Sequence, residues 1–409
     1  MSISELIGTL TGRHRIAWLL IVSIITVLMV NAGFTGVASG QSEASESQYP
    51  DLDISSPSAI LIDALSGKVL YAKDEHKRCP PASVTKIMTL LLAFESLERG
   101  QVTYEDTVVV SPNASEMGGS QMYLWANEEV TFRHVVKGVA IGSANDGAVA
   151  VAEHLGGSEG NFVSMMNSRA AELGMQNTTF ANSHGLDDPN HLTTAYDIAL
   201  MSREAVKYPE LLRLSSIRHE VLTDGLKPRD LLNRNRLISS YSGCDGLKTG
   251  YTETALYCLS ATAKRGDTRL IAVVMGARTP DLRTRDIVAM LNYGFGNYTT
   301  VPVMKKGDSL TERPGVAVYL GDSDYCSVVA EDDFGVTVER GQETALERRI
   351  ELPEQVVAPV EEGQPLGYIA VFKDGEELGQ VNLVASKSIK RLNYLQLIWR
   401  LFTLVHEPR

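Results

Sequence analysis

Short apolar runs, bounded by polar and turn residues, predict that the folded part of the chain begins with two strands. The segment SAILIDALSGKVLYAKD, residues 58–74, reads as a strand, a Ser66-Gly67 turn and a second strand. A second hairpin is predicted over residues 256–277, where LYCLSATAK and TRLIAVVMGA flank the turn residues RGD. Two strand pairs therefore stand far apart along the chain.

Helical periodicity fills the region between these strands. After Pro81, apolar residues recur at helical spacing until Gly100, namely Ile87, Leu90, Leu91, Phe94 and Leu97. Residues 131–175 read as two or three helical pieces with a break at GSAN, and further helices are expected from about Ala195 and near 282–293. Strands at both ends with helices between them predict an α+β domain over residues 52–300 whose sheet gathers both ends.

The pattern changes after about Val301. Short β-rich runs such as GVAVYLG, FGVTVERG and GYIAVFKDGEELGQVNLVA alternate with Gly and Asp turns, and the helical period disappears. This pattern predicts a separate small all-β domain over residues 301–385.

The last segment, residues 386–409, returns to a helical period. One side carries Leu392, Leu395, Ile398, Trp399, Phe402 and Val405, and the other carries Asn393, Gln396, Arg400 and Thr403. Lys387, Lys390 and Arg391 cluster at its start. Such an amphipathic helix suits the interface of an anionic membrane. The alternative is a helix docked on the all-β domain.

The first forty residues are typical of a targeting segment rather than of the fold. Arg13, His14 and Arg15 precede the apolar run 16–30, and Ala38-Ser39-Gly40 is a candidate cleavage site. Residues 1–40 are therefore predicted to be a signal peptide, followed by a polar linker over 41–51. An uncleaved membrane anchor is the alternative, and in both cases the chain is exported from the cytoplasm.

Composition narrows the functional classes. Of the 409 residues, 44% are hydrophobic and 22% are charged, as in a globular protein with a buried core. The net charge of −12 argues against a nucleic-acid-binding protein, because a polyanion would be repelled. The four cysteines form no metal-ligand cluster; a Cys79–Cys244 bridge is conceivable, but buried thiols are the simpler interpretation. No metal or cofactor is predicted.

The candidate chemistry starts at PPASVTKIMT, where Ser83 precedes Lys86 by three positions. On a helix these side chains share a face, so the amine can reach the hydroxyl. A lysine acts as a base only when neutral, and burial beside another cation lowers its pKa. The pair alone is not specific, because S-x-x-K also occurs by chance on helix surfaces. The chemistry requires a second cation and hydrogen-bond donors for an oxyanion.

Two further elements accompany this pair, and the first of them supplies the second cation. Lys248-Thr249-Gly250 lies in a strand, where the lysine is the second cation, the hydroxyl can bind a carboxylate and glycine permits close approach of a substrate backbone. A serine and an asparagine one residue apart occur both at Ser111 and Asn113 and at Ser143 and Asn145. The second pair is favoured, because it lies at a helix break within apolar helices that provide rigid support.

The order S-x-x-K, S-x-N, K-T-G resembles the signature of penicillin-binding proteins and serine β-lactamases. Surrounding stretches are similar to the low-molecular-weight penicillin-binding proteins that act as D-alanyl-D-alanine carboxypeptidases: PPASVTKIMTLLLAFE, GSANDGAVAVAEH, MNSRAAELGM, HGLDDPNHLTTAYDIAL and DGLKTGYT. The resemblance runs from about residue 50 to the end. It departs from the frequent S-G-N form of the second motif, which reads Ser-Ala-Asn here.

The resemblance implies a role for each matched residue. Ser83 would attack the carbonyl between the two terminal D-alanines of a peptidoglycan stem peptide, and Lys86 would take its proton. Ser143 would relay that proton to the leaving D-alanine, and Asn145 would hold the substrate amide. Lys248, Thr249 and Arg283 would bind the terminal carboxylate. The backbone N–H groups of Ser83 and Tyr251 would form the oxyanion hole, with Gly250 beside the substrate. His184 is expected to be structural.

The resemblance also implies β-lactam inhibition and a location on the outer face of the bacterial cell membrane, with a role in cell-wall formation and cell shape. A β-lactamase or a DD-endopeptidase with the same site remains an alternative, as does a non-catalytic penicillin-binding scaffold. The chain lacks an E-x-x-L-N stretch of the kind that class A β-lactamases use for deacylation, which argues against efficient penicillin hydrolysis.

Overall fold

The computed structural model describes residues 49–223 and 226–406. The predicted signal peptide, residues 1–40, and most of the 41–51 linker lie outside this range.

A five-stranded antiparallel sheet organises the first domain, in the order β2-β1-β9-β8-β7. Its strands are β1 (Ser58–Asp63), β2 (Val69–Lys73), β7 (Cys244–Thr252), β8 (Leu256–Arg265) and β9 (Thr268–Ala277). The first strand pairs with the last, with Ser58 opposite Met275 and Asp63 opposite Leu270. The sheet therefore gathers both ends of the domain, which confirms the predicted α+β fold.

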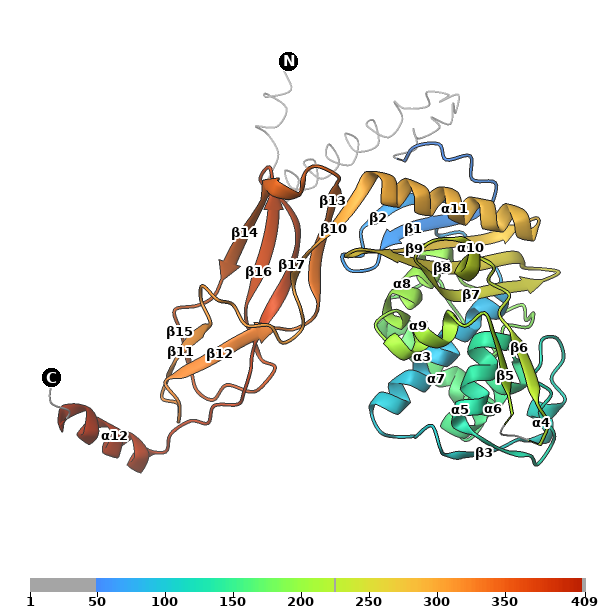
Figure 1. The fold of residues 1–409 in the computed structure, drawn as a ribbon. Helices are drawn as coiled ribbons and strands as arrows, with labels where there is room; N and C mark the ends of the chain where they lie inside the picture. Colours follow the sequence, from blue (N-terminus) through green and yellow to red (C-terminus); the bar gives the residue numbers. More distant parts are fainter. Residues whose placement is uncertain (1–48, 224–225, 407–409) are drawn as a thin grey trace, which may run out of the picture. The chain divides into compact units, whose positions relative to one another are not determined.

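Each face of this sheet contributes to its own hydrophobic core, because successive side chains on a strand point to opposite faces. Leu61 of β1 packs in a cluster with Ile287 and Leu291 of α11 (Pro280–Asn297). Its neighbour Ile60 packs in the other cluster, with α3 (Lys86–Glu98) and α8 (Ala195–Ala205). Figure 1 shows α11 along one face of the sheet and α3 and α8 on the other; the short helix α10 (Leu237–Ser240) packs in the same cluster as α11.

The helix α3 lies at the centre of the larger core, as its apolar sequence predicts. Eleven of its residues are buried, including the side chain of Lys86. It is surrounded by α5 (Phe132–Lys137), α6 (Asn145–Gly156), α7 (Glu159–Glu172) and α9 (Pro209–Ser215). Short elements complete the domain: β3 (Thr107–Val109), α4 (Pro112–Ser115), β4 (Glu129–Thr131), β5 (His219–Leu222), β6 (Arg229–Leu232) and α10 (Leu237–Ser240).

The expected helix break at GSAN, residues 142–145, lies at the end of a π-helical segment that the sequence does not predict. A π-helical segment, Gly138–Gly142, follows α5 directly, and Ser143 then adopts a left-handed conformation with φ 62°. The helix α6 begins at Asn145. Such π segments are frequent at functional sites. Because this one ends at Gly142, Ser143 lies between the two helices and Asn145 is the first residue of α6.

The second domain is all-β, as predicted, with a single three-residue 3-10 turn among residues 301–385, η3 (Glu343–Ala345). A six-stranded sheet has the order β14-β16-β17-β12-β11-β15, and β10 pairs with β13. The strands are β10 (Tyr298–Met304), β11 (Gly315–Tyr319), β12 (Tyr325–Ala330), β13 (Phe334–Glu339), β14 (Leu346–Glu351), β15 (Gln355–Val357), β16 (Pro365–Lys373) and β17 (Glu376–Ala385). Val328, Ile369 and Leu383 belong to its own core.

The C-terminal segment forms the helix α12 (Tyr394–His406). Leu395 and Trp399 on its apolar side are 77% and 72% exposed, so these two side chains are not buried against the all-β domain. Within residues 49–223 and 226–406, no helix combines the length and hydropathy needed to cross a bilayer. The four cysteines are free thiols, so the conceivable Cys79–Cys244 bridge is not formed.

Candidate active site

Ser83 lies in a one-turn 3-10 helix, η1 (Ala82–Thr85), that leads directly into α3. Its side chain is half-buried, whereas Lys86 is fully buried. Because the two residues are three positions apart on consecutive helical turns, their side chains share a face. The amine Nζ of Lys86 lies 3.0 Å from the Ser83 hydroxyl oxygen.

The Lys86 amine has two further partners, the side-chain oxygen of Asn145 and the backbone carbonyl of His184, both at 2.6 Å. Burial holds the pKa of Lys86 well below its usual value, and the charge of Lys248 lowers it further, against the opposing effect of Asp146. A neutral amine has two hydrogens and one lone pair. Donation to Asn145 and His184 uses both hydrogens and leaves the lone pair for the Ser83 proton.

Asn145 and Asp146 fix the neighbouring loop at the start of α6. The amide nitrogen of Asn145 donates to the carbonyl of Gly118 at 2.7 Å, which orients its oxygen toward Lys86. The Asp146 carboxylate accepts from the backbone N–H groups of Met122 and Leu124. The loop that borders the cavity is therefore anchored to the helix that carries Asn145.

The two candidate Ser/Asn pairs lie in different places. Ser143 and Asn145 both line the cavity that contains Ser83. Ser111 instead caps the short helix α4, and Asn113 donates to Glu153 in a separate groove. The structure thus brings the favoured pair to Ser83 and keeps the other pair away from it.

Lys248 and Thr249 are buried in β7, the edge strand beside η1. The Lys248 amine donates to the carbonyl of Thr249 at 3.0 Å. Burial lowers its pKa to about 7, with contributions from the charges of Arg234 and Arg283. Because this pKa lies near physiological pH, the amine is a mixture of charged and neutral forms there, and an incoming anion would favour the charged form.

Gly250 packs closely against the turn that carries Ser83, a contact that the sequence does not reveal. A methyl group at this position would lie 2.9 Å from the Pro81 carbonyl oxygen and 3.0 Å from Cβ of Ala82. The glycine, which was expected to admit a substrate backbone, is required here by the packing of η1 against β7. This contact sets the distance between the Ser83 turn and the Lys248 strand.

These elements enclose a cavity of about 670 Å³. Tyr251 lies at its rim with a half-exposed ring, 4.5 Å from the ring of Tyr257. Arg283 of α11 also lines it; burial lowers the pKa of Arg283, and its Nε has no hydrogen-bond partner among the described residues. A buried guanidinium with a free donor is suited to a carboxylate.

Several functional candidates escaped the sequence analysis. Arg218, Arg234 and Arg236 also line the cavity, and no carboxylate side chain of the described residues lines it. Two of them stand in the run NRNR, residues 233–236, which is the one signal that the sequence offered. The cavity therefore has a strongly cationic wall in a protein of net charge −12.

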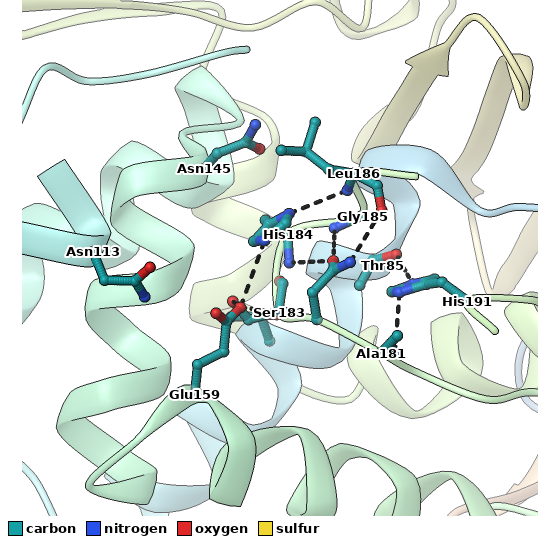
Figure 2. A network of polar contacts seen from close by, with 12 residues as sticks. Thr85, Asn113, Asn145, Glu159, Ala181, Ser183, His184, Gly185, Leu186 and His191 are labelled. Carbon is teal, nitrogen blue, oxygen red and sulfur yellow. Dashed lines mark hydrogen bonds and ion pairs between the residues drawn. The ribbon is translucent and has the colours of Figure 1, made fainter. Parts of the chain in front are cut away.

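His184 is buried, and its ring does not line the cavity. The ring nitrogen Nδ1 accepts from the backbone N–H of Leu186 at 3.1 Å, so the hydrogen is on Nε2 (Figure 2). Burial and the charge of Lys86 lower the pKa of His184 to about 3. The imidazole is therefore neutral at physiological pH, and the backbone carbonyl of the same residue contacts Lys86.

Comparisons with known proteins cover both domains. Residues 42–279 match the family model described as D-alanyl-D-alanine carboxypeptidase, peptidase S11. Residues 298–391 match the model of the penicillin-binding protein 5 C-terminal domain.

Named relatives match over most of their length. The D-alanyl-D-alanine carboxypeptidase DacF of Bacillus subtilis is 39% identical over 84% of this chain and 88% of its own length. The D-alanyl-D-alanine carboxypeptidase DacC of Escherichia coli is 32% identical over 92% of this chain and 95% of its own.

Solved structures agree with these matches. Penicillin-binding protein 5 from Haemophilus influenzae superposes with a TM-score of 0.69 at 31% identity, covering 84% of this chain and 99% of its own. Sequence, fold and cavity therefore lead to one conclusion: the chain belongs to the D-alanyl-D-alanine carboxypeptidase family, the S11 serine peptidases of the low-molecular-weight penicillin-binding protein type.

Proposed function

We propose that this carboxypeptidase works through an acyl-enzyme on Ser83, with Lys86 as the general base. The observation that carries the proposal is the 3.0 Å contact between the Ser83 hydroxyl and a fully buried amine whose two hydrogens have other acceptors. An activated serine hydroxyl is a competent nucleophile toward an amide carbonyl.

In the first half-reaction, Ser83 Oγ attacks the carbonyl carbon of the penultimate D-alanine and its proton passes to Lys86. The backbone N–H groups of Ser83 and Tyr251 stabilise the oxyanion. The C–N bond then breaks, and the leaving nitrogen takes the proton from Lys86 through the hydroxyl of Ser143. Free D-alanine departs and an ester remains on Ser83.

In the second half-reaction, water attacks the ester carbonyl and gives a proton to Lys86. The C–O bond to Ser83 breaks, and the serine oxygen recovers the proton. The shortened peptide leaves with a new carboxylate. Enzyme and base return to their starting protonation states.

Substrate orientation follows from the edge position of β7. Among the residues that the structure describes, this strand pairs only with β8, so a peptide can add along its other edge. Asn145 would hold a substrate amide, and Gly250 would lie beside the added strand. Lys248, Thr249 and Arg283 would bind the terminal carboxylate, supported by the free Nε of Arg283.

Peptidoglycan stem peptides and β-lactams are the proposed ligands. The structure of penicillin-binding protein D2 from Listeria monocytogenes in its ampicillin-bound form is 30% identical to this chain, with a TM-score of 0.55. By analogy, a penicillin would open its ring on Ser83 and occupy the same cavity.

The test is mass spectrometry of the purified protein after incubation with a diacetylated tripeptide ending in D-Ala-D-Ala, and separately with benzylpenicillin. Release of D-alanine and a stable penicilloyl adduct on the peptide that contains Ser83 are expected, with both lost in Ser83→Ala. Rapid loss of the adduct without release of D-alanine would indicate a β-lactamase. Cleavage of a cross-linked dimer in preference to the tripeptide would indicate an endopeptidase.

We also propose that the protein acts at the outer face of the cell membrane. The proposed order is a signal peptide over 1–40, a linker over 41–51, the catalytic domain over 52–300, the all-β domain over 301–385 and a membrane-associating segment over 386–409. Exposed Leu395 and Trp399, beside the exposed Lys387, Lys390 and Arg391, support the last assignment.

A further inference from the structure

Glu159, on the first turn of α7, is connected to the general base through a short chain of contacts. We propose that Glu159 is a positioning residue for Lys86 and acts through the tight turn of residues 182–186. Glu159 does not line the substrate cavity; it borders the separate groove that also contains Asn113 and Glu153. Figure 2 shows Glu159 beside Ser183 and His184.

The first step is the link between the turn and the base. The carbonyl of His184 accepts from Lys86 at 2.6 Å, and the carbonyl of Ser183 accepts from Thr89 at 2.6 Å. Lys86 and Thr89 stand one turn apart on α3. Two consecutive carbonyls of the turn therefore dock on the same face of α3. The direction of the Lys86 lone pair depends on where the His184 carbonyl lies.

The second step is what holds those carbonyls in place. One carboxylate oxygen of Glu159 accepts from both the backbone N–H and the hydroxyl of Ser183, at 3.0 and 2.7 Å. Within the turn, the side-chain oxygen of Asn182 accepts from the N–H of Gly185 at 2.6 Å. That N–H belongs to the same peptide group as the His184 carbonyl. The turn is thus closed by Asn182 and anchored to α7 by Glu159.

The third step concerns charge. The Nε2 atom of His184 lies 3.6 Å from the same Glu159 oxygen. Because Nδ1 accepts from the Leu186 N–H, Nε2 carries the hydrogen and points a neutral donor at the carboxylate. The contact is therefore not an ion pair at neutral pH. Glu159 fixes the turn through acceptance of hydrogen bonds, and a side-chain amide oxygen can do the same.

The prediction is a specific kinetic defect. A displacement of about 1 Å in a catalytic group can cost about 10²-fold in rate. Glu159→Ala is expected to lower the first-order acylation rate constant by about 10- to 100-fold. The dissociation constant of the preceding non-covalent complex should change less than about twofold, because no substrate contact is lost. Glu159→Gln, which keeps the acceptor oxygen, should restore most of the rate.

The experiment is stopped-flow acylation by a fluorescent penicillin, with active sites titrated so that misfolded protein is not counted. Glu153→Ala is the matched control, since Glu153 borders the same groove and, among the described residues, its side chain hydrogen-bonds only to the exposed Asn113. It should acylate at the native rate. The proposal is overturned if titrated Glu159→Ala acylates like Glu153→Ala, if its defect lies in the dissociation constant, or if Glu159→Gln is as slow as Glu159→Ala. Loss of penicilloylation in the native protein would instead refute the function on which this proposal rests.

Discussion

The amine of Lys86 lies 2.6 Å from the side-chain oxygen of Asn145, although the two residues are 59 positions apart. The contact joins the helix that follows the nucleophile to the helix that follows the π segment. It also occupies one hydrogen of the amine, so that Ser83 meets the lone pair. The proposed base is therefore oriented by residues from three different parts of the chain.

Replacement of the amine tests this arrangement directly. Lys86→Met keeps a long apolar stem in a fully buried site but removes the base. Loss of a general base typically costs about 10²- to 10⁴-fold, so acylation by a fluorescent penicillin should slow by at least about 10²-fold. Lys77→Met, at an exposed lysine, is the control. A rate within tenfold of native would exclude Lys86 as the base.

The pKa of Lys248 predicts a pH dependence of substrate capture. Because this pKa is lowered to about 7, the free enzyme loses the charge of Lys248 as the pH rises through that value. A neutral amine binds the terminal carboxylate less well. The kcat/KM for a D-Ala-D-Ala tripeptide should therefore fall on the alkaline side, and this limb reports the free enzyme.

Arg234 provides the matching variant, since its charge is the leading electrostatic cause of that lowered pKa after burial. Arg234→Gln removes a repelling cation, so the pKa of Lys248 rises and the alkaline limb moves to higher pH. Arg278→Gln, at an exposed arginine, should leave the limb in place. An unchanged limb in Arg234→Gln would show that another group controls it.

The fold and most of the proposed site were predictable because they depend on residue type and spacing. The apolar runs in residues 58–74 predicted the strand pair that contains β1, and the three-residue spacing of Ser83 and Lys86 predicted their contact. The Ser143 and Asn145 pair was separated from Ser111 and Asn113 by its apolar surroundings alone.

Other features depend on contacts between distant backbone atoms, which residue types do not record. The His184 carbonyl reaches Lys86 through a group that every residue possesses, so the sequence drew attention to the imidazole instead. The need for glycine at position 250 comes from the Pro81 carbonyl, 169 residues earlier. The role of Arg234 depends on how a loop folds beside β7.

Gly185 tests the close packing of the turn against the nucleophile. It has φ +86°, and a methyl group there would lie 1.9 Å from the carbonyl oxygen of Ala82, next to Ser83. Gly185→Ala should therefore combine a left-handed strain of about 1–2 kcal/mol with overpacking of about 1–3 kcal/mol. Both the free energy of unfolding and the acylation rate should fall.

Gly174→Ala separates the two causes. Gly174 has a similar φ of +76°, but no atom of the described residues outside its immediate chain neighbours lies within 4 Å of the added methyl group. The free energy of unfolding of Gly174→Ala, measured by urea denaturation, should fall only by the cost of the left-handed conformation. Its acylation rate should be normal. Equal losses in the two variants would show that the contact with Ala82 relaxes without cost.

The C-terminal segment predicts that membrane association depends on anionic lipid. Each of Lys387, Lys390 and Arg391 can contribute about 1 kcal/mol near an anionic surface, so the three together correspond to about a hundredfold in affinity. Protein that begins at residue 41 should sediment with anionic vesicles and less with neutral ones, and added salt should weaken the binding.

Deletion of 387–409 should release the protein from vesicles while D-alanine release continues, because the cavity lies entirely in the first domain. Lys387→Glu combined with Lys390→Glu should weaken binding to anionic vesicles and leave binding to neutral vesicles unchanged. If apolar insertion without a charge requirement caused the binding, the double variant would bind anionic vesicles as well as the native protein does. Retention of the truncated protein on vesicles would place the membrane-binding surface elsewhere in the chain.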